Sequence, residues 1–520
     1  MLAHARFAIM AAGLLIGVVP SARADDGSVV RVASGLVREC AAARAGDVRV
    51  FRGIPYAAST AGDNRWRAPQ PVEPWDDIRP CDEFGPACPQ PPYAKDSVYY
   101  REPEQQSEDC LHLNVWTAAT DAAERRPVMV WIHGGALTRG SGAVNVYDGT
   151  ALACKAVVVV TINYRLGPLG FFAHPELSAE STQQVSGNYG LLDQVAALKW
   201  VQQNIAGFGG DPGCVTIFGE SAGSLSVNVL VASPLTKGLF HRAIGQSGTA
   251  FRALSTLATA EAQGKKLAGD ISLAELRQLA PDKLIELANS RGDGRTAPIV
   301  DGWLLPEQPL AIYAAGKQNQ VPTITGSNAD EMTTLSPVGA RPKTLKALQA
   351  QIALLLGAPD AINRLYPATS DADAERAYLD IVGDVTFTLP ARMWARWNTQ
   401  AGSEAYLYQF TRVPPEAQSA GLGAFHAAEI AYVFDNLDRL GRSITDTDRK
   451  LASAMSTYWT TFARSGGPNT ADLPEWKPYT RQDEPTMDLG DNVKLVNHVR
   501  QEKLDLLEGL LQKRSTAGGN

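Results

Sequence analysis

The sequence predicts an α/β fold built on a mostly parallel sheet, and the order of its apolar segments supports this prediction. Two short continuous runs rich in Val and Ile, 127–132 and 156–162, are typical of strands covered on both faces. An apolar stripe at helical spacing follows over 189–205, then a strand at 215–218 and a second helix at 222–232. Strands that alternate with helices in this way favour a parallel sheet flanked by helices.

The remainder of the chain is predicted to complete this sheet and to cover it. Apolar runs at 321–326 and 405–410 are typical of further strands. Two segments, about 251–320 and 334–400, are richer in Ala, Leu and charged residues, and we expect them to form helical insertions that make a cap or gorge wall. We therefore expect residues 25–520 to form a single domain.

The N-terminus has the pattern of a secretory signal peptide. Residues 1–6 are short and basic, residues 7–19 are apolar, and Ala22-Arg23-Ala24 is a small-x-small cleavage pattern. The apolar run of about 13 residues is shorter than the roughly 20 that a membrane-spanning helix needs. We expect cleavage after about Ala24, export to the periplasm or the medium, and no membrane span in the mature chain.

Composition excludes several other functions. The net charge of −7 at pH 7 gives the chain no basic footprint for nucleic acid or for an anionic membrane. The six cysteines include no C-x-x-C pair, and in an exported chain they favour disulfides over a metal site. We expect a small-molecule substrate, with no metal and no cofactor.

A candidate nucleophile lies between the strand at 215–218 and the helix at 222–232. Gly219-Glu220-Ser221-Ala222-Gly223 fits the pattern G-x-S-x-G, and a strand before it with a helix after it is the context that this motif needs. The sharp turn holds the Ser221 hydroxyl at the carboxyl edge of the sheet. Glu220 beside it is expected to be a buried structural carboxylate.

Serine needs a base and an acid that orients the base, and in this fold class both follow the serine in the order acid, then histidine. Three histidines follow Ser221: His241, His426 and His498. His241 is too close to the serine, and His498 lies beyond the last recognisable strand. His426 follows a glycine-rich loop just after the strand at 405–410, which suits a catalytic base.

The acid should follow a strand, and two carboxylates do so. Asp330 and Glu331 both come shortly after the strand at 321–326. Order and spacing do not separate them.

Backbone N–H groups should stabilise the oxyanion. Ile132-His133-Gly134-Gly135 ends an apolar strand in the manner of an HGGG-type loop, and two glycines let the backbone approach the substrate. The N–H of Ala222 supplies another donor, and each donor is worth roughly 3–4 kcal/mol in the transition state. His133 is expected to be structural because it precedes Ser221.

Several motifs, in order, resemble the type-B carboxylesterase family, which includes cholinesterases and bacterial p-nitrobenzyl esterases. The resemblance covers about residues 29–500. The motifs are Phe51-Arg52-Gly53-Ile54-Pro55-Tyr56-Ala57, Ser107-Glu108-Asp109-Cys110-Leu111-His112-Leu113-Asn114-Val115, the HGG loop, Asn163-Tyr164-Arg165, Gly187-Asn188-Tyr189-Gly190, and Phe218 to Gly223. The resemblance implies an α/β-hydrolase fold.

The resemblance also implies roles for particular residues. The family's acid is the glutamate of a G-x-x-x-D-E segment, which is Glu331 here, and its histidine opens an H-x-x-E-I/L segment, which is His426 here. The oxyanion donors would be Gly135, Ala136 and Ala222. Many members have a third glycine at the position of Ala136, so the extra methyl is expected to narrow access for bulky alcohol groups.

A disulfide between Cys88 and Cys110 is a further implication of the resemblance. That bridge would close a loop bordering the active-site entrance, and such a constraint is worth about 3 kcal/mol in the chain-entropy model. For the other cysteines we considered the pairs Cys40–Cys81 and Cys154–Cys214. The second pair is disfavoured because its strands should flank a third one, about 9.6 Å apart in total, whereas disulfide Cα atoms rarely exceed about 7 Å.

Two ion pairs also resemble scaffold contacts of the family. These are Arg165 with Asp193 and Arg52 with Glu108. We expect both pairs to be structural.

The function predicted from these observations is carboxylic-ester hydrolysis through an acyl-enzyme on Ser221. An amide or carbamate hydrolase, or an acyltransferase, could use the same residues. A non-catalytic binding module is disfavoured because serine, acid and histidine all stand in place.

Overall fold

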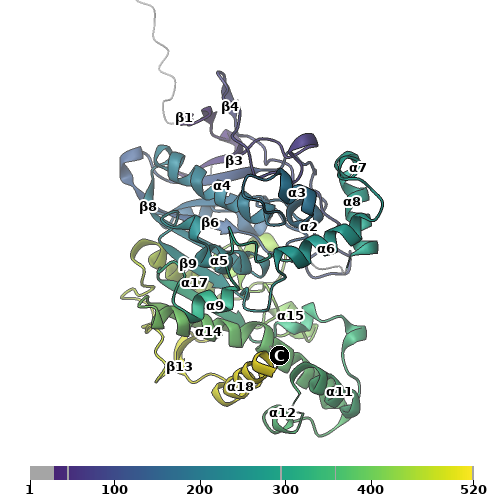
Figure 1. The fold of residues 1–520 in the computed structure, drawn as a ribbon. Helices are drawn as coiled ribbons and strands as arrows, with labels where there is room; N and C mark the ends of the chain where they lie inside the picture. Colours follow the sequence, from purple (N-terminus) through teal and green to yellow (C-terminus); the bar gives the residue numbers. More distant parts are fainter. Residues whose placement is uncertain (1–28, 44–45, 293–295, 358, 518–520) are drawn as a thin grey trace, which may run out of the picture.

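A ten-stranded sheet crosses the middle of the molecule (Figure 1). The computed structural model describes residues 29–517 except 44–45, 293–295 and 358, so the predicted signal peptide lies outside the described residues. The strands of this sheet are β3 (Arg49–Pro55), β5 (His112–Thr117), β6 (Arg126–Ile132), β7 (Val158–Ile162), β8 (Gly210–Glu220), β9 (Arg242–Gln246), β10 (Thr323–Asn328), β11 (Ala405–Phe410), β12 (Pro485–Leu489) and β13 (Lys494–Asn497).

The spatial order of the strands is β13-β12-β11-β10-β9-β8-β6-β7-β5-β3. Neighbours from β12 to β7 pair in parallel, and the antiparallel pairs are confined to the two ends of the sheet. The mostly parallel sheet predicted from the sequence is therefore confirmed. A second, three-stranded sheet near the N-terminus contains β1 (Val29–Val32), β2 (Gly35–Arg38) and β4 (Ile78–Pro80).

Helices connect and cover the strands. As far as residue 314, the described chain contains α1 (Thr150–Ala153), α2 (Gly167–Phe171), α3 (Pro175–Glu180), α4 (Tyr189–Asn204), α5 (Ala222–Ala232), α6 (Leu257–Ala268), α7 (Leu273–Gln278), α8 (Pro281–Arg291) and α9 (Pro309–Ala314). The rest of it contains α10 (Met332–Leu335), α11 (Leu345–Leu356), α12 (Pro359–Leu365), α13 (Asp371–Gly383), α14 (Leu389–Gln400), α15 (Pro415–Ser419), α16 (Ile430–Val433), α17 (Asp446–Ser465) and α18 (Gln501–Ala517).

Strand β6 shows why a continuous apolar run is needed at the centre of this sheet. Its side chains alternate between the two faces, as those of any strand do. Val128, Val130 and Ile132 pack into a core that includes α4 and α5. Met129 and Trp131 pack into a second core, which includes α16 and α17. Both faces are covered, so every residue from Val128 to Ile132 is buried.

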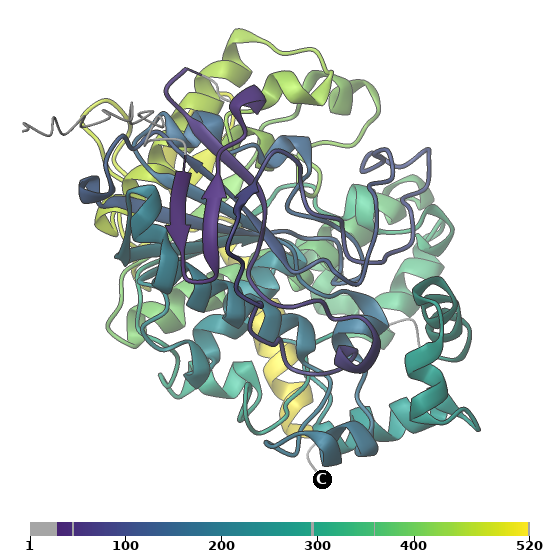
Figure 2. The same cartoon turned by 90° about the horizontal axis from the view of Figure 1, so that it is seen from above.

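The two predicted insertions contain the helices α6 to α9 and α11 to α14. Figures 1 and 2 show α7 and α8 at one edge of the molecule, with α11 and α12 at a separate edge. A π-helical turn, Asp384–Thr388, joins α13 to α14. It places Phe387 against His426, with the ring centroids 5.1 Å apart.

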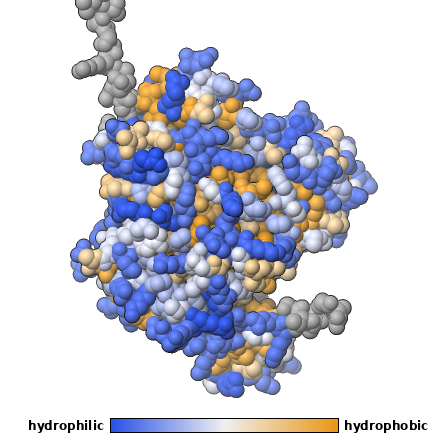
Figure 3. Space-filling view, turned by 60° about the vertical axis from the view of Figure 1, so that its left-hand side comes forward, coloured by the Kyte–Doolittle hydropathy of each residue, from blue (hydrophilic) through white to orange (hydrophobic). Residues whose placement is uncertain are grey.

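Apolar surface gathers near the middle of the face shown in Figure 3, between hydrophilic regions. Within the described part of the chain, none of the helices combines the length and the apolar content that crossing a membrane requires.

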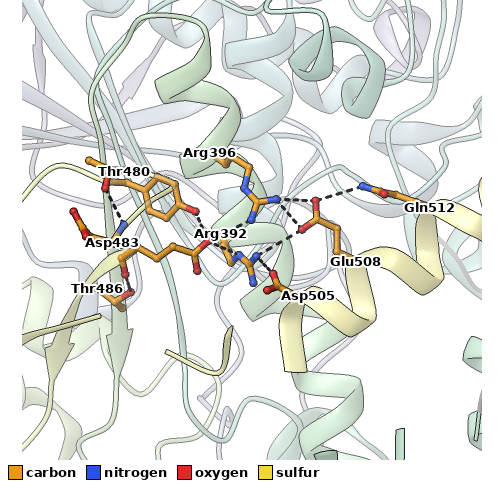
Figure 4. A network of polar contacts seen from close by, with 10 residues as sticks. Arg392, Arg396, Thr480, Asp483, Thr486, Asp505, Glu508 and Gln512 are labelled. Atoms are coloured by element: carbon orange, nitrogen blue, oxygen red, sulfur yellow. Dashed lines mark hydrogen bonds and ion pairs between the residues drawn. The ribbon is translucent and has the colours of Figure 1, made fainter. Parts of the chain in front are cut away.

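A network of charged side chains attaches the C-terminal helix to the body (Figure 4). Arg392, on α14, lies 3.3 Å from Glu484 and also contacts Asp505 of α18. Arg396, one turn later, lies 2.8 Å from Glu508 of α18 and 3.4 Å from Glu484. The side chains of Arg392 and Glu484 are only 3% and 5% exposed, so their charges are compensated within this network rather than by solvent.

We expect Arg392→Ala to lower the free energy of unfolding by about 3 kcal/mol, because it leaves a buried carboxylate with fewer partners. Chemical denaturation of the purified protein measures this change. Lys283→Ala is the control, since Lys283 pairs with Glu286 at the surface of α8 with both side chains mostly exposed. Equal stability of the two variants would contradict a structural role for the network.

Candidate active site

Ser221 lies in a strained turn between β8 and α5. Its backbone angles are φ 56° and ψ −121°, a conformation that costs a non-glycine residue about 1–3 kcal/mol. A Cβ on Gly219 would stand 2.6 Å from the carbonyl oxygen of Ile132, and one on Gly223 would stand 2.0 Å from the same oxygen. Both glycines of the motif are therefore required by close contact with β6, which fixes the elbow that carries Ser221.

The HGG loop lies directly against this elbow. A Cβ on Gly134 would stand 3.1 Å from Cβ of Ser221, so the loop backbone and the serine are in contact. Gly135 has φ 106° and Ala136 has φ 56°. The N–H groups of Gly135 and Ala136 donate no hydrogen bond within the described residues. Ala222 is the first residue of α5, where N–H groups lack an intrahelical partner.

His133 fixes the start of the HGG loop through buried contacts. It is buried, its ring stacks on Tyr164 at 4.4 Å, and the Tyr164 hydroxyl donates to its carbonyl at 2.8 Å. Burial lowers the pKa of His133 to about 3, so the ring is neutral near neutral pH. This geometry supports the structural role predicted for it.

Glu331 and His426 meet although they are far apart in sequence. Oε2 of Glu331 is 2.5 Å from Nδ1 of His426, and both side chains are buried. Glu331 lies three residues after the end of β10 and directly before α10, and its Oε1 accepts a hydrogen bond from the N–H of Asn328 at 2.7 Å. The carboxylate is therefore fixed by the end of a central strand and in turn orients the imidazole.

Nε2 of His426 faces Glu220, the residue before Ser221. It lies 3.0 Å from Oε1 of Glu220, but neither atom has a partner with hydrogen-bond geometry. In the described residues no hydrogen bond joins Ser221 to His426; the imidazole lies instead against Glu220, the residue before Ser221. Burial raises the pKa of Glu220. For His426 burial lowers the pKa, but the charges of Glu220 and Glu331 outweigh burial and raise it well above its ordinary value.

The alternative acid, Asp330, points elsewhere. It forms an ion pair with Arg376 of α13 at 2.6 Å and accepts a hydrogen bond from the N–H of Ala424 at 2.8 Å. The structure thus brings Glu331, and not Asp330, to the imidazole of His426. Among the described residues, neither His241 nor His498 forms a hydrogen bond or an ion pair with Glu331.

A third buried carboxylate, Glu429, supports the same region. It accepts hydrogen bonds from the side chains of Gln246 at 3.0 Å and Asn328 at 2.7 Å. Gln246 in turn accepts from the indole of Trp459 at 3.1 Å. Burial raises the pKa of Glu429 to about 8. The contacts of Glu429 and Glu220 were missed from the sequence, although both residues stand within the motifs.

The charge of Glu220 should affect the acidic limb of the pH profile, because it raises the pKa of His426. His426 accepts a proton only when neutral, so kcat/KM should rise with pH through its raised pKa, above the ordinary 6.5. Glu220→Gln keeps the shape but removes one of the two carboxylates that raise this pKa. We expect the limb to move to lower pH, measured from kcat/KM with a p-nitrophenyl ester. A limb that stays in place or moves upward would contradict the assignment.

The predicted disulfide is present between Cys88 and Cys110. The pairs Cys40–Cys81 and Cys154–Cys214 are wrong, since these four cysteines are free. Cys154 caps the end of α1 just before β7, and Cys214 lies in β8; strands β7 and β8 stand on opposite sides of β6.

The two buried thiols of the first pair each face a backbone carbonyl rather than each other. Sγ of Cys40 faces the carbonyl of Asp82, and Sγ of Cys81 faces that of Arg79. Burial raises the pKa of the Cys81 thiol to about 12.

One predicted scaffold ion pair is confirmed and the other is wrong. Arg165 and Asp193 are paired at 2.6 Å and fully buried. Glu108 pairs with Arg65 at 2.5 Å, whereas the Arg52 guanidinium lies 4.6 Å from the centre of the Phe84 ring.

Tyr99, within the loop closed by the disulfide, contacts the backbone of His426 and the short helix that follows Glu331. Its hydroxyl donates to the carbonyl of His426 at 3.0 Å and lies 2.6 Å from the hydroxyl of Thr334, on α10 just after Glu331. Sequence analysis did not identify this residue, because nothing in its neighbourhood marks a tyrosine that reaches across the fold.

We expect Tyr99→Phe to lower kcat about fivefold with little change in KM, because a hydrogen bond worth about 1 kcal/mol no longer positions His426. Steady-state kinetics with a p-nitrophenyl ester measures the split. Tyr100→Phe is the control, since the Tyr100 hydroxyl reaches only Glu102 at the surface. An equal effect of both variants would show that Tyr99 has no special role.

Comparison with known proteins is consistent with this geometry. A sequence model described as the carboxylesterase family matches residues 26–507. The fumonisin B1 esterase of Sphingopyxis macrogoltabida is 40% identical, covering 89% of this chain and 87% of its own. The para-nitrobenzyl esterase of Bacillus subtilis is 36% identical, covering 88% and 94%.

A solved PNB esterase structure superposes on this one with a TM-score of 0.82 at 34% identity, over 92% of this chain and 99% of its own. The predicted α/β-hydrolase fold is thereby confirmed. The chain belongs to the carboxylesterase family and is a carboxylic-ester hydrolase.

Proposed function

We propose that Ser221, His426 and Glu331 form the catalytic triad of this ester hydrolase. The observation that carries the proposal is the 2.5 Å contact between Glu331 and His426 beside the strained elbow of Ser221. With Nδ1 donating to Glu331, Nε2 is left as the proton acceptor. Nε2 is buried beside Glu220 and makes no hydrogen bond within the described residues, which leaves it free to accept the proton of the Ser221 hydroxyl.

The proposed reaction has two acyl-transfer steps. His426 accepts the Ser221 proton while Oγ attacks the ester carbonyl, and the N–H groups of Gly135, Ala136 and Ala222 bind the negative oxygen. The tetrahedral intermediate collapses, the C–O bond to the alcohol breaks, and His426 returns the proton to the departing alcohol. A water molecule then repeats the sequence on the acyl-enzyme, which releases the acid and restores Ser221.

A fluorophosphonate probe tests this mechanism directly. We expect stoichiometric labelling, and peptide mass spectrometry should locate the label on Ser221. Labelling at another residue, or no labelling of protein that hydrolyses esters, would overturn the proposal. Matched ester and amide substrates of the same acyl group then separate ester hydrolysis from the amide hydrolase that the same residues could support.

We also infer that the chain is exported. The basic, apolar and small-x-small segments of residues 1–24 support this inference, as does the disulfide between Cys88 and Cys110, a bond that persists in oxidising compartments. N-terminal sequencing of the protein from its source should begin near Asp25, and an intact Met1 would contradict export by cleavage. Residues 25–520 would then form the single catalytic domain.

A further inference from the structure

Two arginines flank an aromatic ring at the proposed oxyanion loop. The guanidinium carbon of Arg101 is 4.9 Å from the centre of the Tyr93 ring, and that of Arg139 is 5.5 Å from it. The Tyr93 hydroxyl is only 3.3 Å from the place where a Cβ on Gly135 would stand. Both guanidinium groups therefore pack on the Tyr93 ring, whose hydroxyl lies at the edge of the loop proposed to bind the ester carbonyl.

Neither arginine is paired with a carboxylate in the described part of the chain. Arg139 donates from Nε to the carbonyl of Pro91 at 3.2 Å. The two carboxylates whose charges act on Tyr93 have other contacts. Glu104 accepts a hydrogen bond from the hydroxyl of Ser141 at 2.5 Å, and Glu220 lies against His426. Two half-buried cations at the loop thus form no ion pair with a carboxylate among the described residues.

The charge of Arg101 also acts toward the interior of the loop. Burial lowers the pKa of His133, and the charge of Arg101 lowers it further. The positive charge of Arg101 therefore affects the electrostatic potential at His133, the first residue of the HGG loop, as well as at the surface of the loop.

The solvent-facing part of the loop lies next to these cations. His133 and Gly134 are buried, whereas Gly135 and Ser221 are half-exposed and Ala136 is exposed. An ester whose carbonyl oxygen lies at the N–H groups of Gly135 and Ala136 must extend its other groups through this exposed part. Guanidinium groups without a protein carboxylate bind a ligand carboxylate strongly, through two parallel N–H donors.

We propose that Arg101 and Arg139 bind a carboxylate carried by the substrate, so that the enzyme prefers anionic esters over neutral ones. This inference rests on the proposed function, because it takes the loop at Gly135 as the place where the ester carbonyl binds. Tyr93 holds the two guanidinium groups beside the loop. The carboxylate can belong to the acyl part or to the alcohol part of the ester.

The wild-type enzyme provides the first test. The acyl arm compares the p-nitrophenyl monoester of adipic acid with the p-nitrophenyl ester of adipic monoamide, which has the same shape without the charge. The alcohol arm compares 4-acetoxybenzoate with 4-acetoxybenzamide. We expect kcat/KM to favour the anionic member of one pair at least about tenfold, and to lose most of that preference as salt rises from 20 to 500 mM. The arm that responds identifies the part of the ester that carries the carboxylate.

Substitutions provide the second test. We expect Arg101→Ala and Arg139→Ala each to lower the ratio of kcat/KM for the anionic and neutral esters about tenfold, with partial recovery in Arg101→Lys. Arg449→Ala is the matched control, since Arg449 pairs with Asp438 at the exposed surface of α17 and should leave the ratio unchanged.

An absence of preference in both wild-type arms would overturn the proposal without any variant, and leave the two arginines as packing for Tyr93. Unchanged ratios in both alanine variants would do the same. Ester hydrolysis of the neutral substrates would still stand in either case, so a failure here is distinguishable from failure of the proposed triad.

Discussion

Replacement of Ser221 by alanine is expected to lower kcat for a p-nitrophenyl ester by roughly five to six orders of magnitude. The reason is that the proposed mechanism forms the acyl-enzyme on the hydroxyl of Ser221, so without that hydroxyl the acyl-enzyme cannot form. The oxyanion donors and the binding site remain, and a small residual rate above that of water is expected from them. Stopped assays at high enzyme concentration measure the remaining rate.

A second serine of the same helix controls for changes in the fold. Ser233 ends α5, and its hydroxyl accepts a hydrogen bond from the N–H of Leu235. Ser233→Ala should keep activity close to that of the wild type. If Ser221→Ala retained more than about one-thousandth of the wild-type kcat, the serine would not be the nucleophile.

The parts of the fold that could be predicted are those in which one residue pattern has one physical solution. The run at 127–132 is apolar on both faces because β6 is covered by helices on both sides. The helix predicted at 222–232 matches α5 residue for residue, and the one predicted at 189–205 ends one residue late. The turn at Ser221 requires glycine at positions 219 and 223, so the motif can be recognised from the sequence alone.

The wrong ion pair shows where such reasoning fails. Arg52 stands in a strand segment where the register of β3 against β5 shifts between Phe51 and Ile54. A bulge changes the direction in which side chains point. Arg52 turns to the ring of Phe84, and the nearby Arg65 binds Glu108 in its place. A local backbone irregularity of this kind leaves no periodic signal in the sequence.

The contacts around His426 could not be predicted from the sequence either, because they depend on how the strands are ordered. Glu220 lies 3.0 Å from Nε2, and the network of Glu429, Asn328 and Gln246 lies behind the acid. These residues come from β8, β9, β10 and the loop after β11, so their contacts depend on the order of strands in the sheet. Sequence order fixed the candidates for the triad, but only the packed sheet shows which buried charges surround it.

We expect Glu331→Gln to lower kcat by about four orders of magnitude. The amide has the same shape, but it removes the charge that stabilises the imidazolium and can hold His426 in the wrong tautomer. KM should change much less, because Glu331 is buried behind the histidine. The pH dependence of the residual activity should also move to lower pH, since one of the carboxylates that raise the pKa of His426 is gone.

The neighbouring carboxylate is the matched control. Asp330→Asn changes the same charge one residue earlier, but Asp330 contacts Arg376 and the N–H of Ala424 rather than the imidazole. It should therefore reduce stability through the loop that carries His426 and lower kcat less than about tenfold. Thermal unfolding separates that effect from chemistry. The reverse result, with Asp330→Asn inactive and Glu331→Gln active, would make Asp330 the acid and would require His426 to leave the 2.5 Å contact seen here.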